Sequence, residues 1–151
     1  MQVGFIGLGV MARPMAGHLI AAGHKVVVWA RRPASAAPLA AQGATVYASP
    51  AELARHCPVL FTMVTSSADV EGVILGPDGL IHGLAPDSVV VDCSTIAPDV
   101  ARRIAARLAE AGSHFIDAPV SGGEQGARDA TLAIMAGGEA AALERVRPLL
   151  Q

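Results

Sequence analysis

The sequence predicts an α/β fold in which a doubly wound, mainly parallel sheet has helices on both faces. Three observations lead to this prediction. Strand-like and helix-like segments alternate through all 151 residues, a length that suits one domain with a sizeable core. The runs 58–64 and 88–92 are apolar without polar alternation, as in parallel strands covered on both sides. Finally, the first strand-like run leads directly into a glycine motif that opens a helix.

Each predicted element has a local signal. Met11, Met15 and Leu19 recur at helical spacing after the first strand, and Ser49 is an N-cap ahead of Pro50. A stripe of apolar residues and a closing glycine define the helix over 98–111. The predicted strands are 3–6, 25–29, 44–47, 58–64, 88–92, 114–117 and 131–136. The predicted helices follow the glycine motif and cover 33–41, 50–56, 66–75, 98–111 and the chain from about 139.

Composition narrows the class of protein. Apolar residues make up 52% of the chain, charged residues 16%, and the formal net charge is −2, so neither disorder nor a nucleic-acid partner is expected. We also expect no membrane partner and a cytoplasmic location, since there is neither a spanning apolar run nor a signal-peptide pattern. Cys57 and Cys93 are predicted to be buried, reduced thiols, and the five histidines show no metal-ligand spacing.

The motif Gly7-Leu8-Gly9-Val10-Met11-Ala12 predicts a Rossmann-type dinucleotide site. Gly7 would make the tight turn, and Gly9 would let a pyrophosphate approach the backbone. The small Ala12 side chain would keep the helix close to the strand, while the helix N-terminus would present N–H groups to the anion.

The end of the second strand favours NADP over NAD. NAD-selective sites usually place a carboxylate there for the ribose 2′-hydroxyl, but this chain has no acidic residue before Glu52. Instead Arg31 and Arg32 offer positive charge where a 2′-phosphate would lie. The alternative is that the two arginines are only a solvated turn before Pro33.

A second segment, 117–138, is unusually rich in glycine. Ser121 supplies a hydroxyl group, and Gly122 and Gly123 leave backbone N–H groups open to an anion such as a carboxylate. From spacing alone, a binding loop and a structural turn are equally good interpretations.

Together, the segments 7–15 and 117–138 resemble the two signature segments of the β-hydroxyacid dehydrogenases, and the resemblance extends over nearly the whole chain. Within that family, Glu124 and the run 139–149 are most similar to reductases of tartronate semialdehyde (2-hydroxy-3-oxopropanoate), with 3-hydroxyisobutyrate dehydrogenases as the close alternative. The resemblance implies reduction of tartronate semialdehyde to glycerate with NAD(P)H. One departure is Ala130, at a position where relatives commonly have glycine.

The resemblance also implies roles for individual residues, carried over by position. The cofactor would contact the glycine motif, the end of the second strand and the residues beside the nicotinamide: Gly7, Leu8, Gly9, Val10, Met11, Arg31, Met63, Val64, Thr65 and Thr95. Arg32 joins this set because of its positive charge, not through the resemblance. The small carboxylate substrate would contact Ser121, Gly122, Gly123 and Thr95.

No catalytic residue is expected within this chain. The family's proton-donating lysine belongs to a later helical domain, and the single lysine here, Lys25, begins the second strand, at the edge opposite the ligand crevice. We therefore expect residues 1–151 to be a slightly truncated NAD(P)-binding domain, inactive alone, of an enzyme that is a homo-oligomer at full length. An alternative of another class is a non-catalytic nucleotide-binding module.

Overall fold

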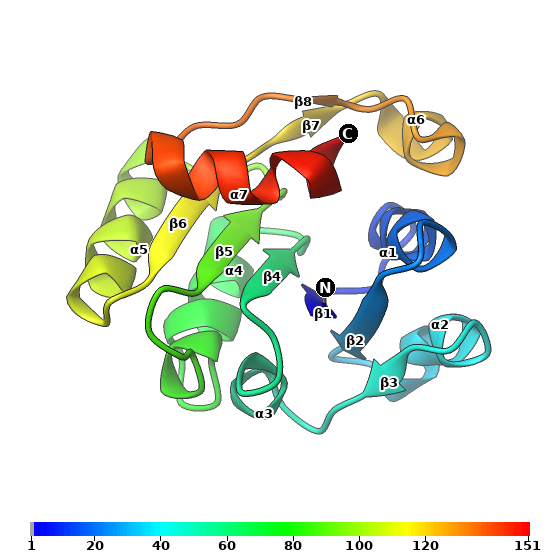
Figure 1. The fold of residues 1–151 in the computed structure, drawn as a ribbon, viewed down its shortest axis with the longest axis horizontal. Coiled ribbons are helices and arrows are strands. Elements are labelled where there is room, and N and C mark those ends of the chain that lie inside the picture. The colour runs from blue at the N-terminus through cyan, green and yellow to red at the C-terminus, as the bar shows by residue number, and fades with distance from the viewer. Residues whose placement is uncertain (1) are drawn as a thin grey trace.

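A computed structural model describes residues 2–151 and has a central sheet between two layers of helices (Figure 1). The strands are β1 (Gln2–Ile6), β2 (Lys25–Trp29), β3 (Thr45–Val46), β4 (Val59–Thr62), β5 (Val89–Asp92), β6 (His114–Asp117), β7 (Val120–Ser121) and β8 (Ala133–Ile134). The α-helices are α1 (Ala12–Ala21), α2 (Ala37–Ala40), α3 (Pro50–Ala54), α4 (Ser67–Leu75), α5 (Pro98–Glu110), α6 (Gly123–Asp129) and α7 (Ala140–Leu150). Two 3₁₀ turns cover Pro33–Ala36 and Leu80–His82.

The main sheet has six parallel strands in the order β3-β2-β1-β4-β5-β6. The chain winds outward from β1 through β2 to β3, then returns to β4 on the other side of β1 and continues to β6. The direction of winding therefore reverses between β1 and β4, and a ligand crevice forms at the carboxyl ends of the strands at such a point. This order confirms the predicted doubly wound fold.

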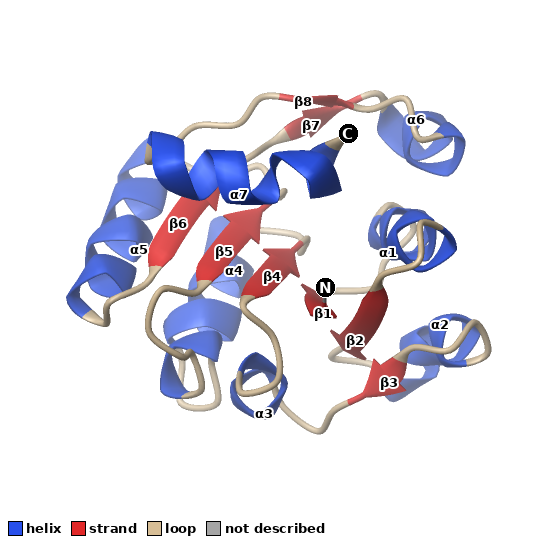
Figure 2. Ribbon diagram, viewed as in Figure 1, coloured by secondary structure: helices blue, strands red, loops and turns tan. Residues whose placement is uncertain are grey.

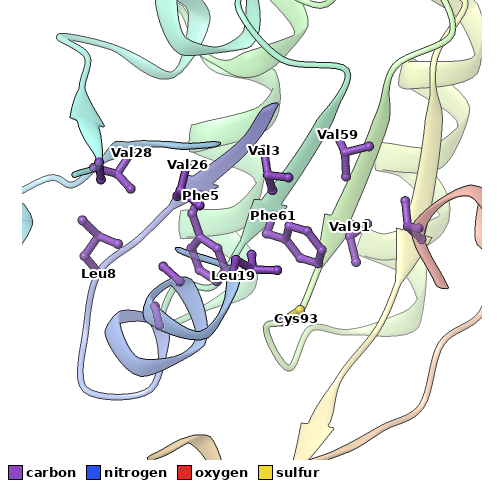
Figure 3. Packing of buried hydrophobic residues seen from close by; sticks show 14 of the residues in the cluster. Val3, Phe5, Leu8, Leu19, Val26, Val28, Val59, Phe61, Val91 and Cys93 are labelled. Atoms are coloured by element: carbon purple, nitrogen blue, oxygen red, sulfur yellow. The ribbon is translucent and has the colours of Figure 1, made fainter. Parts of the chain in front are cut away.

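Each face of the sheet packs against its own set of helices. Helices α1, α2 and α7 cover one face, where Phe5 and Phe61 stack with their ring centroids 5.7 Å apart (Figure 3). Helices α3, α4 and α5 cover the other face, which buries Leu60, Val90 and Ile104 completely. The central strands β4 and β5 are buried on both sides, which explains why their sequences are apolar without alternation.

Serine N-caps fix the starts of two helices at this sheet. The Ser49 hydroxyl accepts a hydrogen bond from the Glu52 backbone N–H at 3.1 Å, as the capping motif predicts. At the start of α4, Ser66 accepts from the Asp69 N–H at 3.2 Å. Both caps satisfy donors that the first helical turn leaves unpaired.

The segment after β6 differs from the prediction. The expected loop at Ser121-Gly122-Gly123 is the end of β7 followed by the start of α6, a helix that the sequence analysis missed. The expected strand 131–136 is only the two-residue β8, which pairs antiparallel with β7 outside the main sheet (Figure 2). Two glycines and the absence of an apolar stripe hide α6 from pattern analysis.

Candidate nucleotide-binding site

A hollow of about 220 Å³ opens at the carboxyl edge of the sheet, where the direction of winding reverses. It unites the β1–α1 turn with the residues that follow β2 and β4. Its lining residues are Gly7, Leu8, Gly9, Trp29, Ala30, Arg31, Arg32, Ser35, Met63, Val64 and Val73. Seven of the predicted cofactor residues thus meet in one hollow, although they come from three separate parts of the sequence.

Gly7 and Gly9 play different parts in this hollow. Gly7 has φ +90°, and a Cβ atom added to it would lie 2.2 Å from the Met63 carbonyl oxygen, so the fold itself requires glycine there. A Cβ atom on the exposed Gly9 would meet no atom within 4 Å among the described residues. Packing does not require glycine at position 9, but close approach of a ligand to the backbone would.

Helix α1 begins at this hollow without a capping side chain. Among the described residues, its N-cap Met11 makes no side-chain capping bond, and the first turn contains no acidic residue. The Arg13 N–H already donates to the Gly9 carbonyl oxygen at 3.1 Å, and Pro14 has no N–H, so the helix dipole is what favours an anion here. This chemistry and the open space at Gly9 fit the pyrophosphate of a dinucleotide.

Arg31 and Arg32 follow β2 at the mouth of the hollow, and both are exposed. Arg31 Nη2 donates to Asp69 Oδ1 at 2.8 Å, which joins the end of β2 to the first turn of α4. Hydrogen bonding to Arg31 and Ser66 lowers the pKa of Asp69 below its usual range, so this carboxylate is ionised at neutral pH. The sequence analysis did not identify this partner.

On the other side of the hollow, the β4–α4 loop is fixed to the β5–α5 loop. The backbone N–H of Val64 donates to the Ser94 hydroxyl at 2.9 Å, and the Ala97 N–H donates to Ser67 at 3.1 Å. These bonds join the loop containing the predicted Met63, Val64 and Thr65 to the loop containing Thr95. Thr65 and Thr95 are both exposed.

Behind these loops lies the buried carboxyl group of Asp92. Its Oδ1 accepts hydrogen bonds from the Thr62 hydroxyl at 2.8 Å and the Ser94 N–H at 3.2 Å, while Oδ2 has no partner among the described residues. Burial raises the pKa of Asp92 to about 6, despite those hydrogen bonds. The pKa of Asp117, its register partner on β6, is also raised by burial.

The predicted substrate residues lie on the β7–α6 corner. Ser121, Gly122 and Gly123 are exposed, and the two glycines have φ values of +136° and +65°. His18 of α1 makes a 2.8 Å hydrogen bond through Nε2 to the Ala127 carbonyl oxygen of α6. This bond holds the corner against α1. The corner lies outside the hollow. Four predicted cofactor residues also lie outside it: Val10, Met11, Thr65 and Thr95. Of these, Val10 lines a separate depression beside α2.

Several lining residues were not among the predicted site residues. Trp29 and Ser35 flank the arginine pair, and Val73 reaches the hollow from α4. The Ser35 hydroxyl, close behind the two arginines in the sequence, could have been predicted as a site residue. The position of Val73 at the hollow could not, because it depends on the order of strands in the sheet. The predicted edge for Lys25 is confirmed, because it begins β2 at the end opposite the hollow.

The strand order, the glycine turn and the uncapped start of α1 define a dinucleotide-binding domain of the Rossmann class. More particularly, the chain belongs to the family described as the NAD binding domain of 6-phosphogluconate dehydrogenase, which matches residues 2–151. Within residues 2–151, none of the helices combines the length and apolar character needed to cross a membrane.

Known relatives confirm the resemblance to β-hydroxyacid dehydrogenases. The 3-hydroxyisobutyrate dehydrogenase of Pseudomonas aeruginosa is 41% identical over 150 residues, which are 99% of this chain and 50% of the relative. The 2-hydroxy-3-oxopropionate reductase of Escherichia coli is 40% identical over 151 residues, which are 100% of this chain and 51% of the relative. The chain therefore spans about half the length of these curated relatives.

The solved structure of Psf3 in complex with NADP+ and 2-OPP has the same fold, with a TM-score of 0.93 and 38% identity. The similarity covers 98% of this chain and 52% of that one. The chain is thus the cofactor-binding domain of a β-hydroxyacid dehydrogenase family.

Proposed function

We propose that this domain serves a reductase that converts tartronate semialdehyde to glycerate with NAD(P)H, and that NADPH is the preferred nucleotide. The observation that supports this proposal best is the hollow at the carboxyl edge, where the glycine turn, two arginines and the β4–α4 loop meet. Oxidoreduction of 3-hydroxyisobutyrate is the alternative, because relatives of both kinds are about equally similar.

In this proposal, residues in the hollow and beside it bind different parts of the nucleotide. The turn from Gly7 to Met11 and the start of α1 bind the pyrophosphate, and Arg31 and Arg32 bind the adenosine 2′-phosphate. Met63, Val64, Thr65 and Thr95 would hold the nicotinamide end, which would supply the hydride. The bond from the Val64 N–H to Ser94 would keep these two loops in position.

The substrate carboxylate would bind at the β7–α6 corner, to the Ser121 hydroxyl and the N–H groups of Gly122 and Gly123, with Thr95 beside it. Both glycines have positive φ values and are exposed, and without side chains they leave their backbone N–H groups open to an anion. We assign the proton donor to the part of the relatives' length that this chain does not span, because Lys25 lies at the opposite edge of the sheet.

The nucleotide proposal is tested by titrating the chain with NADPH and NADH while following nucleotide fluorescence. We expect Arg31→Ala to weaken NADPH binding by about tenfold or more, since it removes a charge-assisted contact, and to change NADH binding little. Arg103→Ala is the matched control, because Arg103 pairs with Glu71 on the α4–α5 surface, away from the hollow. Equal loss of both nucleotides in the Arg31 variant would contradict a 2′-phosphate site there.

The substrate proposal is tested in the protein that contains this domain, by following NADPH absorbance with tartronate semialdehyde and, in the reverse direction, with 3-hydroxyisobutyrate. We expect the higher kcat/KM for tartronate semialdehyde. Turnover of 3-hydroxyisobutyrate alone would replace the first assignment with the alternative.

A further inference from the structure

We infer that Asp69 is a determinant of nucleotide choice, and that it weakens selection of NADPH by competing with the 2′-phosphate for Arg31. This inference rests on the proposed nucleotide site. It concerns a residue on α4, outside the glycine turn and the β2 end that ordinarily decide between the two nucleotides.

The geometry of the ion pair is the first argument. Arg31 Nη2 and Asp69 Oδ1 are 2.8 Å apart, and the side chains are 71% and 26% exposed respectively. Arg31 lines the hollow that contains Gly7 and Gly9, but it also lines a neighbouring depression of about 240 Å³ that includes Asp69. The carboxylate therefore holds the guanidinium at the boundary between the two.

Asp69 is the more rigid partner. Its backbone N–H donates to the Ser66 hydroxyl at 3.2 Å, and the next residue of α4, Val70, is completely buried. Arg31 is a long, largely exposed side chain after a strand end. The negative charge of Asp69 is thus fixed at the edge of the hollow, and the guanidinium is the group that must adjust when a ligand binds.

The charges determine the consequence for each nucleotide. A 2′-phosphate bound to Arg31 would have to share the guanidinium with a carboxylate, and the two anions would repel each other. A ribose 2′-hydroxyl carries no charge and meets no such repulsion. Arg31 has further N–H groups beyond the one that Asp69 uses, so NADPH would still bind, but with a smaller advantage over NADH.

The test is Asp69→Asn, which keeps the size of the side chain and the Ser66 cap on the backbone but removes the charge. We expect NADPH to bind ~10-fold more tightly, which corresponds to about 1.4 kcal/mol, and NADH to change less than about twofold. In an Arg31→Ala background the same substitution should give a clearly smaller gain in NADPH binding, because the competition for the guanidinium is gone and only the direct repulsion between carboxylate and phosphate remains.

Glu71→Gln is the matched control. It removes one negative charge and one arginine pair from the same helix, but its partner Arg103 lies on α5. An unchanged NADPH-to-NADH affinity ratio in Asp69→Asn overturns the inference, and so does an equal gain in Glu71→Gln or in the Arg31→Ala background. In these outcomes nucleotide binding itself persists, so the proposed site survives. If neither nucleotide binds the unsubstituted chain, the site and the inference both fail.

Discussion

At the scale of single residues, Ala130 has an unusual backbone. It ends α6 with φ 56° and ψ 40°, the left-handed conformation that glycine adopts more easily. We predict that Ala130→Gly raises the free energy of unfolding by about 1 kcal/mol, because relief of the Cβ strain exceeds the added entropy of the unfolded chain. Urea denaturation measures the change.

The matched control is Ala109→Gly, an exposed position within α5 where the backbone is helical. This substitution should lower the free energy of unfolding by about 1 kcal/mol. A loss of stability in both variants would contradict the assigned strain at Ala130. The resemblance to relatives with glycine at this position pointed to the same site, but only the structure supplies the reason.

At the scale of elements, the carboxyl group of Asp92 links the ends of β4 and β5 through Thr62 and Ser94. Its pKa is raised to about 6 by burial, so the folded state binds a proton more tightly than the unfolded state. The stabilisation is therefore complete below the unfolded pKa and is lost as the pH rises to about 6. The predicted loss is about 2 to 3 kcal/mol between pH 4 and pH 6.5.

Asp92→Asn should remove most of this loss, because asparagine keeps the oxygen that accepts from Thr62 and Ser94 but does not titrate. Urea unfolding of both proteins at several pH values between 4 and 6.5 measures the effect. If the variant and the original chain lose the same stability over that range, Asp92 is not the group that titrates.

The sequence correctly predicted those elements that are marked by a local pattern, such as an apolar run or an N-cap. The apolar runs of β4 and β5 and the cap at Ser49 gave correct elements, and Gly9 and Arg31, which follow predicted strands, both line the hollow. Helix α6 was missed because its stability depends on contacts made after folding, including the bond from His18 to the Ala127 carbonyl, 109 residues apart in the chain. The contact between Asp69 and Arg31 was missed for the same reason, since the sheet order brings α4 beside the end of β2.

At the scale of the whole molecule, the order of strands in the sheet brings the residues of the proposed nucleotide site together. β1 lies between β2 and β4, so the glycine turn after β1 is flanked by the residues that follow both neighbours (Figure 1). The central claim is that this junction binds a dinucleotide, with its pyrophosphate close to Gly9. Of the two glycines in the turn, only Gly7 is required by the fold. A substitution at Gly9 can therefore test nucleotide binding without disturbing folding.

The most direct measurement is therefore an NADPH titration of the chain and of Gly9→Ala, with thermal unfolding of both. A Cβ atom at position 9 meets open space, so we predict a midpoint within about 2 °C of the original. The same atom would stand where the pyrophosphate must approach, so NADPH should bind more weakly by at least about tenfold. Undiminished NADPH binding by a folded Gly9→Ala chain would contradict the site proposed at this junction.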